Sequence, residues 1–213
     1  MVYEKTFYQK INTVADWIIR IIMLNVLMII TSLAVVTIFP SLSAGYKMFY
    51  QYVHKDEEKL FKGYFTYFIQ DIGKKMGIGL ILILIVGLGY LNVTYYVDLL
   101  NVNSNLLYLI GYYLTLAVLA SSFVITLYTL SVIHVLPDLK LTLMFKLAFY
   151  VSGKFFLKTV LLVLTTIIPF VMLMFPFTMV LFVFSGLSIP VLLNVLITDK
   201  VVDYIEGLVK SDV

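Results

Sequence analysis

The sequence contains no cysteine, which excludes disulfides, thiolate catalysis and cysteine-ligated metal sites. Charged residues are also scarce: they make up 13% of the 213 residues, against roughly 25% in typical soluble domains. Two histidines, His54 and His134, lie far apart in the sequence without metal-ligand spacing. There is no H-E-x-x-H, no G-x-S-x-G and no phosphate-binding loop. The sequence therefore favours a protein that is not an enzyme and requires no cofactor.

Apolar residues are in excess, at 62% of the chain, with a mean hydropathy of +1.04. A helix needs about 20 apolar residues to cross the hydrocarbon core of a membrane. Four runs without charged side chains reach that length: residues 21–46, 76–97, 99–137 and 159–198. These runs lack the alternation of barrel strands, and in lipid every backbone group must be paired. We therefore predict an all-α, polytopic helical membrane protein.

The apolar runs predict about five transmembrane helices within one membrane domain, residues 1–213. The predicted spans are at about 17–39, 76–97, 106–133, 159–176 and 177–198. The boundary between the last two spans has two readings. A tight hairpin near Phe175-Pro176-Phe177 gives two spans and is preferred, whereas a break at Ser185-Gly186 gives one long helix and a short re-entrant piece.

A cytoplasmic amphipathic helix is predicted at residues 56–72. Four apolar side chains recur there at helical spacing and fall on one face: Phe61, Phe65, Phe68 and Ile72. Negative charge, which the helix dipole favours at an N-terminus, precedes this face at Asp56, Glu57 and Glu58. Such a segment is typical of a helix that lies at the membrane surface.

Lysine and arginine are unevenly distributed between the predicted loops. Residues 40–75, residues 134–158 and the C-terminal tail together carry twelve of them, against three on the other side, Lys5, Lys10 and Arg20. Because basic residues concentrate in cytoplasmic loops, we predict that the N-terminus is outside and the C-terminus cytoplasmic. The lysines flank membrane spans, so we expect contact with the lipid bilayer and none with nucleic acid.

The stretch V35-V-T-I-F-P-S-L-S-A-G-Y46 concentrates small and polar residues where the first apolar run ends. A signal-peptidase site is disfavoured because the preceding apolar run is longer than a signal peptide requires. Thr37 can bond back to a backbone carbonyl, and Pro40 suits the start of a helix. Ser41 and Ala44 are small enough for another helix to approach closely. We interpret the stretch as a helix break at membrane level that positions the amphipathic segment.

Asp16-Trp17 through Asn25, the V-V-T-I-F-P-S-L-S-A-G-Y junction and the later D-E-E-K-L-F-K-G-Y-F resemble the YesL-type family. Members of this family are bacterial integral membrane proteins of unknown function. The matching positions are Asn25, Thr37, Pro40, Ala44, Glu58, Phe61 and Phe65. The resemblance implies a location in the bacterial plasma membrane and an accessory role in carbohydrate uptake, and it does not imply catalysis.

Three classes of function follow. The first is an accessory or regulatory protein that docks a sugar permease or sensor through Phe61, Phe65 and Phe68. The second is a small oligomeric transporter or channel for neutral solutes, with a cavity lined by Asn25, Ser121 and Asn194. For these polar residues, hydrogen bonding between helices is the favoured interpretation. A membrane enzyme is the third class and ranks last.

Overall fold

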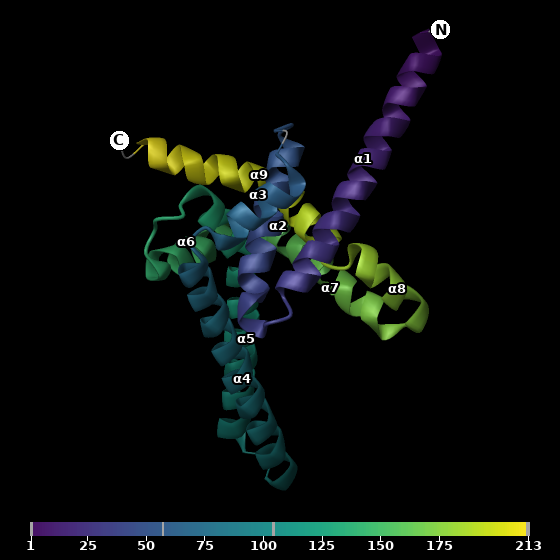
Figure 1. Cartoon of the computed structure of the whole chain (residues 1–213). Helices are drawn as coiled ribbons and strands as arrows, with labels where there is room; N and C mark the ends of the chain where they lie inside the picture. The colour runs from purple at the N-terminus through teal and green to yellow at the C-terminus, as the bar shows by residue number, and fades with distance from the viewer. Residues whose placement is uncertain (1, 57, 104, 212–213) are drawn as a thin grey trace. The chain divides into compact units, whose positions relative to one another are not determined.

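The computed structural model describes residues 2–56, 58–103 and 105–211, and every regular element in these ranges is helical. The elements are α1 (Val2–Thr31), η1 (Val35–Thr37), α2 (Ile38–Val53), α3 (Leu60–Ile69), α4 (Ile72–Val102), α5 (Leu106–Val135), α6 (Leu141–Lys154), α7 (Phe156–Met174), α8 (Pro176–Ser185) and α9 (Ser188–Ser211), shown in Figure 1. The all-α class predicted from the sequence is confirmed.

Four of the described helices are long and apolar enough to cross a membrane: Ile11–Thr31 within α1, Ile72–Val102, Leu106–Val135 and Phe156–Met174. The bent pair α8 and α9 makes a fifth if it is counted as one span. Only 17% of the most apolar window of α4 and 11% of that of α7 is buried by the protein itself. So much exposed apolar surface requires lipid around it. The chain is therefore a polytopic membrane protein.

The described chain forms two compact units. The first unit comprises the described residues up to Gln70 together with Leu164–Leu196. The second comprises Asp71–Val163 together with the described residues from Ile197 onwards. Helices α7 and α9 each contribute to both units, so no linker separates them in the sequence.

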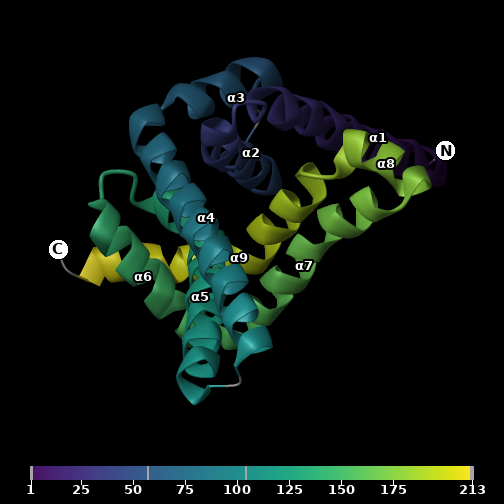
Figure 2. The ribbon, with the colours of Figure 1, turned by 90° about the horizontal axis from the view of Figure 1, so that it is seen from below.

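In the first unit, α2 runs back along α1, and α3 packs on α2. The Ser41 hydroxyl on α2 donates to the Met28 carbonyl on α1 at 2.9 Å. Further along both helices, the guanidinium of Arg20 lies 4.2 Å from the centre of the Tyr52 ring. These two contacts make α1 and α2 antiparallel. Helix α8 lies against α1 (Figure 2).

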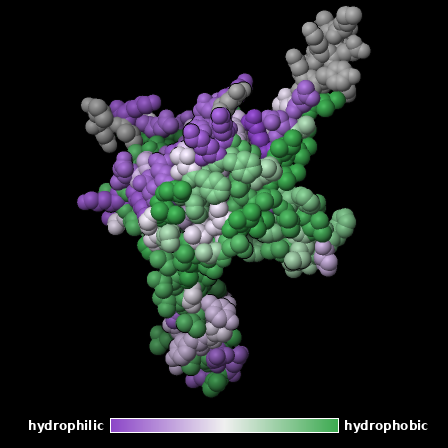
Figure 3. All heavy atoms as spheres, in the orientation of Figure 1, coloured by the Kyte–Doolittle hydropathy of each residue, from purple (hydrophilic) through white to green (hydrophobic). Residues whose placement is uncertain are grey.

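In the second unit, α4 and α5 form a long antiparallel hairpin, and α6 packs on α5. The flanks of this hairpin are hydrophobic, whereas hydrophilic residues lie among hydrophobic ones at its tip (Figure 3). At the opposite end, the ammonium of Lys74 donates to the carbonyls of Pro137 and Leu139. The Tyr128 and Thr159 hydroxyls share a hydrogen bond of 2.9 Å, which joins α5 to α7 within this unit.

Two predicted boundaries near the N-terminus differ from the observed ones. Helix α1 ends at Thr31, well before residue 39. The hydroxyls of Thr31 and of Ser32, the residue that follows α1, bond back to carbonyls of α1, a pattern that weakens helices. The amphipathic segment predicted at 56–72 is helical only over Leu60–Ile69. Asp71 follows it with φ 53°, a left-handed conformation that ends a helix. Glu57 lies outside the described residues.

The two alternatives for the last predicted boundary, a break near Phe175-Pro176-Phe177 and a break at Ser185-Gly186, both occur in the structure. Helix α7 ends at Met174, Phe175 is extended, and Pro176 starts α8 at the first helical position, where proline is favoured. A second break follows Ser185, and α8 and α9 meet there at 59°. The predicted span 177–198 is therefore two helices.

Candidate functional site

Asn25 lies on α1 and is fully buried at 0% exposure. Its Oδ1 accepts hydrogen bonds from the N–H groups of Leu187 (2.8 Å) and Ser188 (2.9 Å). Its Nδ2 donates to the carbonyls of Phe182 (2.9 Å) and Val183 (2.7 Å). An asparagine amide offers two donor and two acceptor positions, so all four are used. The structure thus shows Asn25 bonded to the backbone of the α8–α9 segment, and its predicted cavity-lining role stays a prediction.

The Asn25 amide stands inside the break between α8 and α9. In a continuous helix the N–H of Leu187 would bond to the carbonyl of Val183, four residues earlier. Here both groups bond to Asn25 instead. A side chain that enters the helical ladder in this way causes a sharp bend. One side chain therefore satisfies the backbone groups that the bend releases.

Gly186 and Pro190 favour the same break. A Cβ on Gly186 would lie 2.2 Å from a ring carbon of Phe182, so no larger residue fits without displacing that ring. Pro190 has no N–H to bond to the Gly186 carbonyl, and its ring would clash with that carbonyl in a continuous helix. The sequence pattern and the inserted amide thus end α8 at the same place.

Three hydroxyl groups meet where α1, α2 and α3 approach one another. The hydroxyl of Thr31 lies 2.6 Å from that of Tyr64 and 2.9 Å from that of Ser41. Ser41 and Tyr64 are 3.1 Å apart. Burial raises the pKa of Tyr64, although its two hydroxyl partners act in the opposite direction. We call Thr31, Ser41 and Tyr64 the hydroxyl cluster; it fastens α3 to the α1–α2 turn.

The other predicted junction residues also have structural roles. Thr37, in η1, donates from its hydroxyl to the carbonyls of Thr31 and Ala34, both at 2.6 Å. Pro40 occupies the first turn of α2 and is buried, as is Ala44 one turn later. A Cβ on Gly45 would lie 2.4 Å from the Met28 sulfur, so α2 approaches α1 very closely there. The junction is a compact helical turn.

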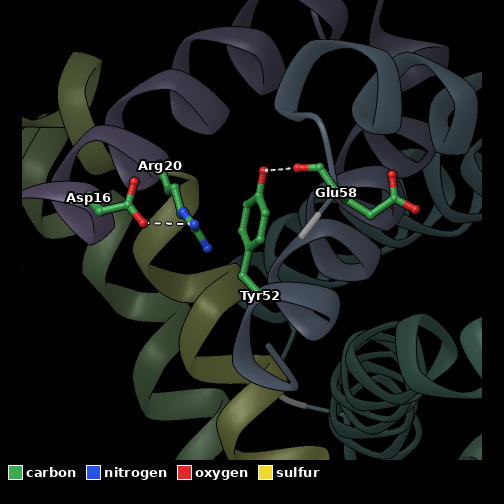
Figure 4. Close-up of polar contacts among 4 residues, drawn as sticks. All are labelled: Asp16, Arg20, Tyr52 and Glu58. Carbon is green, nitrogen blue, oxygen red and sulfur yellow. Dashed lines mark hydrogen bonds and ion pairs between the residues drawn. The ribbon is translucent and has the colours of Figure 1, made fainter. Parts of the chain in front are cut away.

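A charged and aromatic group lies at the other end of the α1–α2 pair (Figure 4). Arg20 is paired with Asp16 at 2.7 Å and covers the face of the Tyr52 ring. The Tyr52 hydroxyl donates to the backbone carbonyl of Glu58 at 3.4 Å. Burial raises the pKa of Tyr52, and the Arg20 charge partly offsets this effect. These contacts hold the end of the α2–α3 loop, at Glu58, near α1.

The predicted docking residues are only partly on one surface. Phe61 is 54% exposed and Phe65 43%, and Ile69, one turn further, is 63% exposed. We call these three residues the α3 stripe. Phe68 is half-buried and stacks near Tyr64, with ring centres 6.4 Å apart. Phe68 therefore belongs to the packed side of α3, and Ile69 takes its place on the exposed side.

The adjoining face of α3 is polar. It lines an open depression of about 440 Å³ formed by Glu58, Lys59, Lys62, Gly63, Thr66 and Tyr67. The Tyr67 hydroxyl donates to the Glu58 carboxylate at 3.0 Å. Burial and this carboxylate, in that order, raise the pKa of Tyr67. The exposed surface of α3 thus combines an apolar stripe with two exposed lysines.

The structure describes the other two predicted cavity residues each within its own unit. Ser121 is exposed on α5, in the second unit, and donates to the Ala117 carbonyl of its own helix at 2.8 Å. Asn194 is buried on α9. Among residues 11–56, 58–103 and 105–208, no three acidic or histidine side chains are grouped so that they could hold a metal ion.

Sequence reasoning missed Thr31, Tyr64 and the Arg20–Tyr52 contact. In the sequence, Tyr64 lies between Phe61 and Phe65, which are exposed. Only its position on a different face of the helix indicates that Tyr64 is packed instead. The partners of Asn25 lie more than 150 positions away in the chain. No local pattern in a single sequence identifies such a pairing.

No curated protein and no solved structure matches this chain. Residues 21–93 match the model of one family. The matched part begins just before Asn25, includes the hydroxyl cluster and the whole of α3, and ends within α4. Over residues 21–93 the chain is therefore similar to the family described as protein of unknown function, DUF624.

Proposed function

We propose that this chain is a non-enzymatic accessory or regulatory protein of the bacterial plasma membrane that acts with a carbohydrate permease or sensor. The α3 stripe is its docking surface. The link to carbohydrate uptake comes from the resemblance to the YesL-type family. The docking role is supported by the exposure of the α3 stripe.

One observation supports this proposal most directly. Phe61, Phe65 and Ile69 form an exposed apolar row on a helix whose opposite side is packed through Tyr64. Lys59 and Lys62 are exposed beside this row. The partner surface that complements it is an apolar patch edged by acidic residues, on an integral membrane protein at the same membrane face.

The polar residues of the candidate site argue for a structural role. Asn25 bonds only to backbone groups of the α8–α9 break. Thr37 bonds to carbonyls of the α1–α2 turn. A catalytic or transport site requires polar groups that remain available to a substrate. These side chains instead maintain the shape of the unit that presents α3.

The test compares two matched pairs of exposed phenylalanines. Phe61→Ser with Phe65→Ser alters the α3 stripe, and Phe175→Ser with Phe177→Ser alters two exposed rings at the α7–α8 turn. We expect a carbohydrate permease or sensor to co-purify stoichiometrically with the wild type and with the α7–α8 variant, and to be lost from the α3 variant. Equal recovery with both variants would contradict the docking role.

Two further measurements distinguish protein docking from lipid contact, and an accessory protein from a transporter. A photo-reactive phenylalanine analogue at position 61 should cross-link to the permease, and cross-links to lipid alone would exclude protein docking. Liposomes that contain the purified protein should take up neutral sugars no faster than empty liposomes. Uptake that is lost in Asn194→Leu would instead identify a transporter.

A further inference from the structure

We infer that the start of α1, the end of α9 and the lysine and arginine residues of the described helices and loops lie on the cytosolic side of the membrane. Helices α1 and α2 form a helical hairpin that enters the bilayer from this side and returns without crossing it. The α3 helix that follows is thereby placed in the cytosolic half of the bilayer, and its Tyr64 side chain extends toward the α1–α2 turn, where its hydroxyl lies 2.6 Å from that of Thr31.

The contacts of the first unit establish the return. Met28 meets Ser41 and Gly45 near the turn. Arg20, nearer the N-terminus, meets Tyr52, nearer the end of α2. Residues late in α1 thus contact residues early in α2, and residues earlier in α1 contact residues late in α2, so the two helices are antiparallel. The loop after α2 begins at the level of Arg20.

The depth of the hairpin follows from helix geometry. At 1.5 Å per residue, the helix from Arg20 to Thr31 rises by about 17 Å, roughly half of a 30 Å hydrocarbon core. Arg20 and its partner Asp16 lie beside Tyr52, which directly precedes the charged α2–α3 loop. Charged groups belong at the headgroup level, so the α1–α2 turn lies near the middle of the membrane.

A turn at that depth must satisfy its own backbone groups, since lipid offers no hydrogen bonds. The hydroxyl of Thr37 bonds to the Thr31 and Ala34 carbonyls, and that of Ser41 bonds to the Met28 carbonyl. These bonds satisfy three backbone carbonyls of the turn within the protein.

In the second unit the chain comes back to its starting side twice, once through α4 and α5 and once between the start of α7 and α9. Gly89 faces Leu119, and Gly111 faces Tyr96, as α4 and α5 run antiparallel. At the start of α4, Lys74 bonds to the carbonyls of Pro137 and Leu139 just beyond the end of α5. Before α7, the Phe155 ring lies 5.7 Å from that of Tyr204 on α9, so the chain that leaves through α7 comes back through α9.

Helices α3 and α6, which connect the antiparallel helix pairs, do not cross the membrane. Helix α3 has 10 residues and α6 has 14, which correspond to lengths of about 15 and 21 Å. Both are shorter than the hydrocarbon core and both contain lysine. All the return points therefore lie on one side of the membrane.

The charges agree with this topology. All fifteen lysine and arginine residues fall on the side of the return points, and none occurs in residues 21–46, 76–139 or 159–199. That asymmetry identifies the cytosolic side. The result differs from the orientation predicted from the sequence, which placed the N-terminus outside because it counted residues 17–39 as one full crossing.

The absence of native cysteine makes the test direct, because each single-cysteine variant carries only one thiol. The positions are Asn12 and Ala15 on α1, Leu33 at the α1–α2 turn, Asn101 at the end of α4 and Asp138 after α5, all exposed in the structure. A membrane-impermeant maleimide is applied to intact cells and to inverted membrane vesicles.

We expect Asn12→Cys, Ala15→Cys and Asp138→Cys to be labelled only in inverted vesicles and Asn101→Cys only in intact cells. Leu33→Cys should not be labelled from either side until the membrane is dissolved in detergent. Labelling of Asn12→Cys or Ala15→Cys in intact cells would overturn the proposed topology. Labelling of Leu33→Cys in intact cells would show that α1 crosses completely. Two α1 positions are tested so that the result does not depend on one variant folding.

Discussion

At the scale of single residues, Asn25 has the most demanding environment in the first unit. It is fully buried on a helix that passes through an apolar region, and it bonds to four backbone groups of another segment. A buried polar group is stable only when its hydrogen bonds are made. Asn25 and the α8–α9 break therefore depend on each other.

Asn25→Leu should destabilise the protein by about 2–4 kcal/mol, because buried backbone groups left without partners cost roughly 1–3 kcal/mol each. The free energy of unfolding can be measured by denaturant titration in detergent micelles. Asn92→Leu is the matched control, since Asn92 is exposed on α4, and a surface change of this kind should stay within about 0.5 kcal/mol. Equal losses in the two variants would contradict the role assigned to Asn25.

Tyr64→Phe removes the hydroxyl that joins Thr31 and Ser41 and should cost about 1 kcal/mol. Burial raises the pKa of Tyr64 above its ordinary value near 10, so the folded protein keeps its proton where the unfolded chain loses it. The contribution of Tyr64 to stability is therefore constant below about pH 10 and is lost as the pH rises further.

Unfolding titrations from pH 7 to pH 11 would test this pH dependence. The wild type should lose more stability above pH 10 than Tyr64→Phe does. Tyr90→Phe, at a 68% exposed position on α4, should change the free energy of unfolding at pH 7 by less than about 0.5 kcal/mol. Identical pH curves for the wild type and Tyr64→Phe would refute the assignment.

At the scale of the helices, the closest approach in the first unit is between α1 and α2. Gly45 lies against the Met28 side chain, and Ser41 bonds to the Met28 carbonyl. Small residues permit this kind of close packing between helices in membranes. The α1–α2 hairpin depends on their size.

Gly45→Ala should destabilise the protein by about 1–3 kcal/mol, because the added Cβ would lie 2.4 Å from the Met28 sulfur. Met28→Ala with Gly45→Ala should lose less stability than the sum of the two single changes, since the clash is removed. Gly73→Ala is the control: it has open space around its Cβ position, and the helix gains up to about 1 kcal/mol from alanine. Additive losses in the double variant would show that the contact is absent.

At the scale of the whole molecule, the chain enters each compact unit twice, and two helices belong to both units. An interleaved path of this kind has no linker composition. It also explains why the sequence showed one domain. The basic residues nevertheless follow one simple rule, since all fifteen lie outside residues 21–46, 76–139 and 159–199.

The sequence by itself determined that this protein lies in a lipid membrane and that its secondary structure is helical. Long charge-free runs are stable only in lipid, and lipid permits only fully hydrogen-bonded backbones. Local composition also identified Asn25, Thr37 and Ser41 as unusual positions and located the exposed face of α3 near Phe61 and Phe65. These properties depend on neighbouring residues, so one sequence is sufficient to read them.

Only the tertiary structure decided where the first helix turns back, which groups Asn25 satisfies and which rings of α3 are packed. The apolar composition continues from α1 through the turn into α2, so hydropathy alone predicts one helix where the structure has two antiparallel ones. The bonds from Asn25 to the α8–α9 break connect residues more than 150 positions apart. Such contacts depend on how the folded helices pack. The residues that neighbour Asn25 in the sequence therefore do not indicate which distant residues it bonds to.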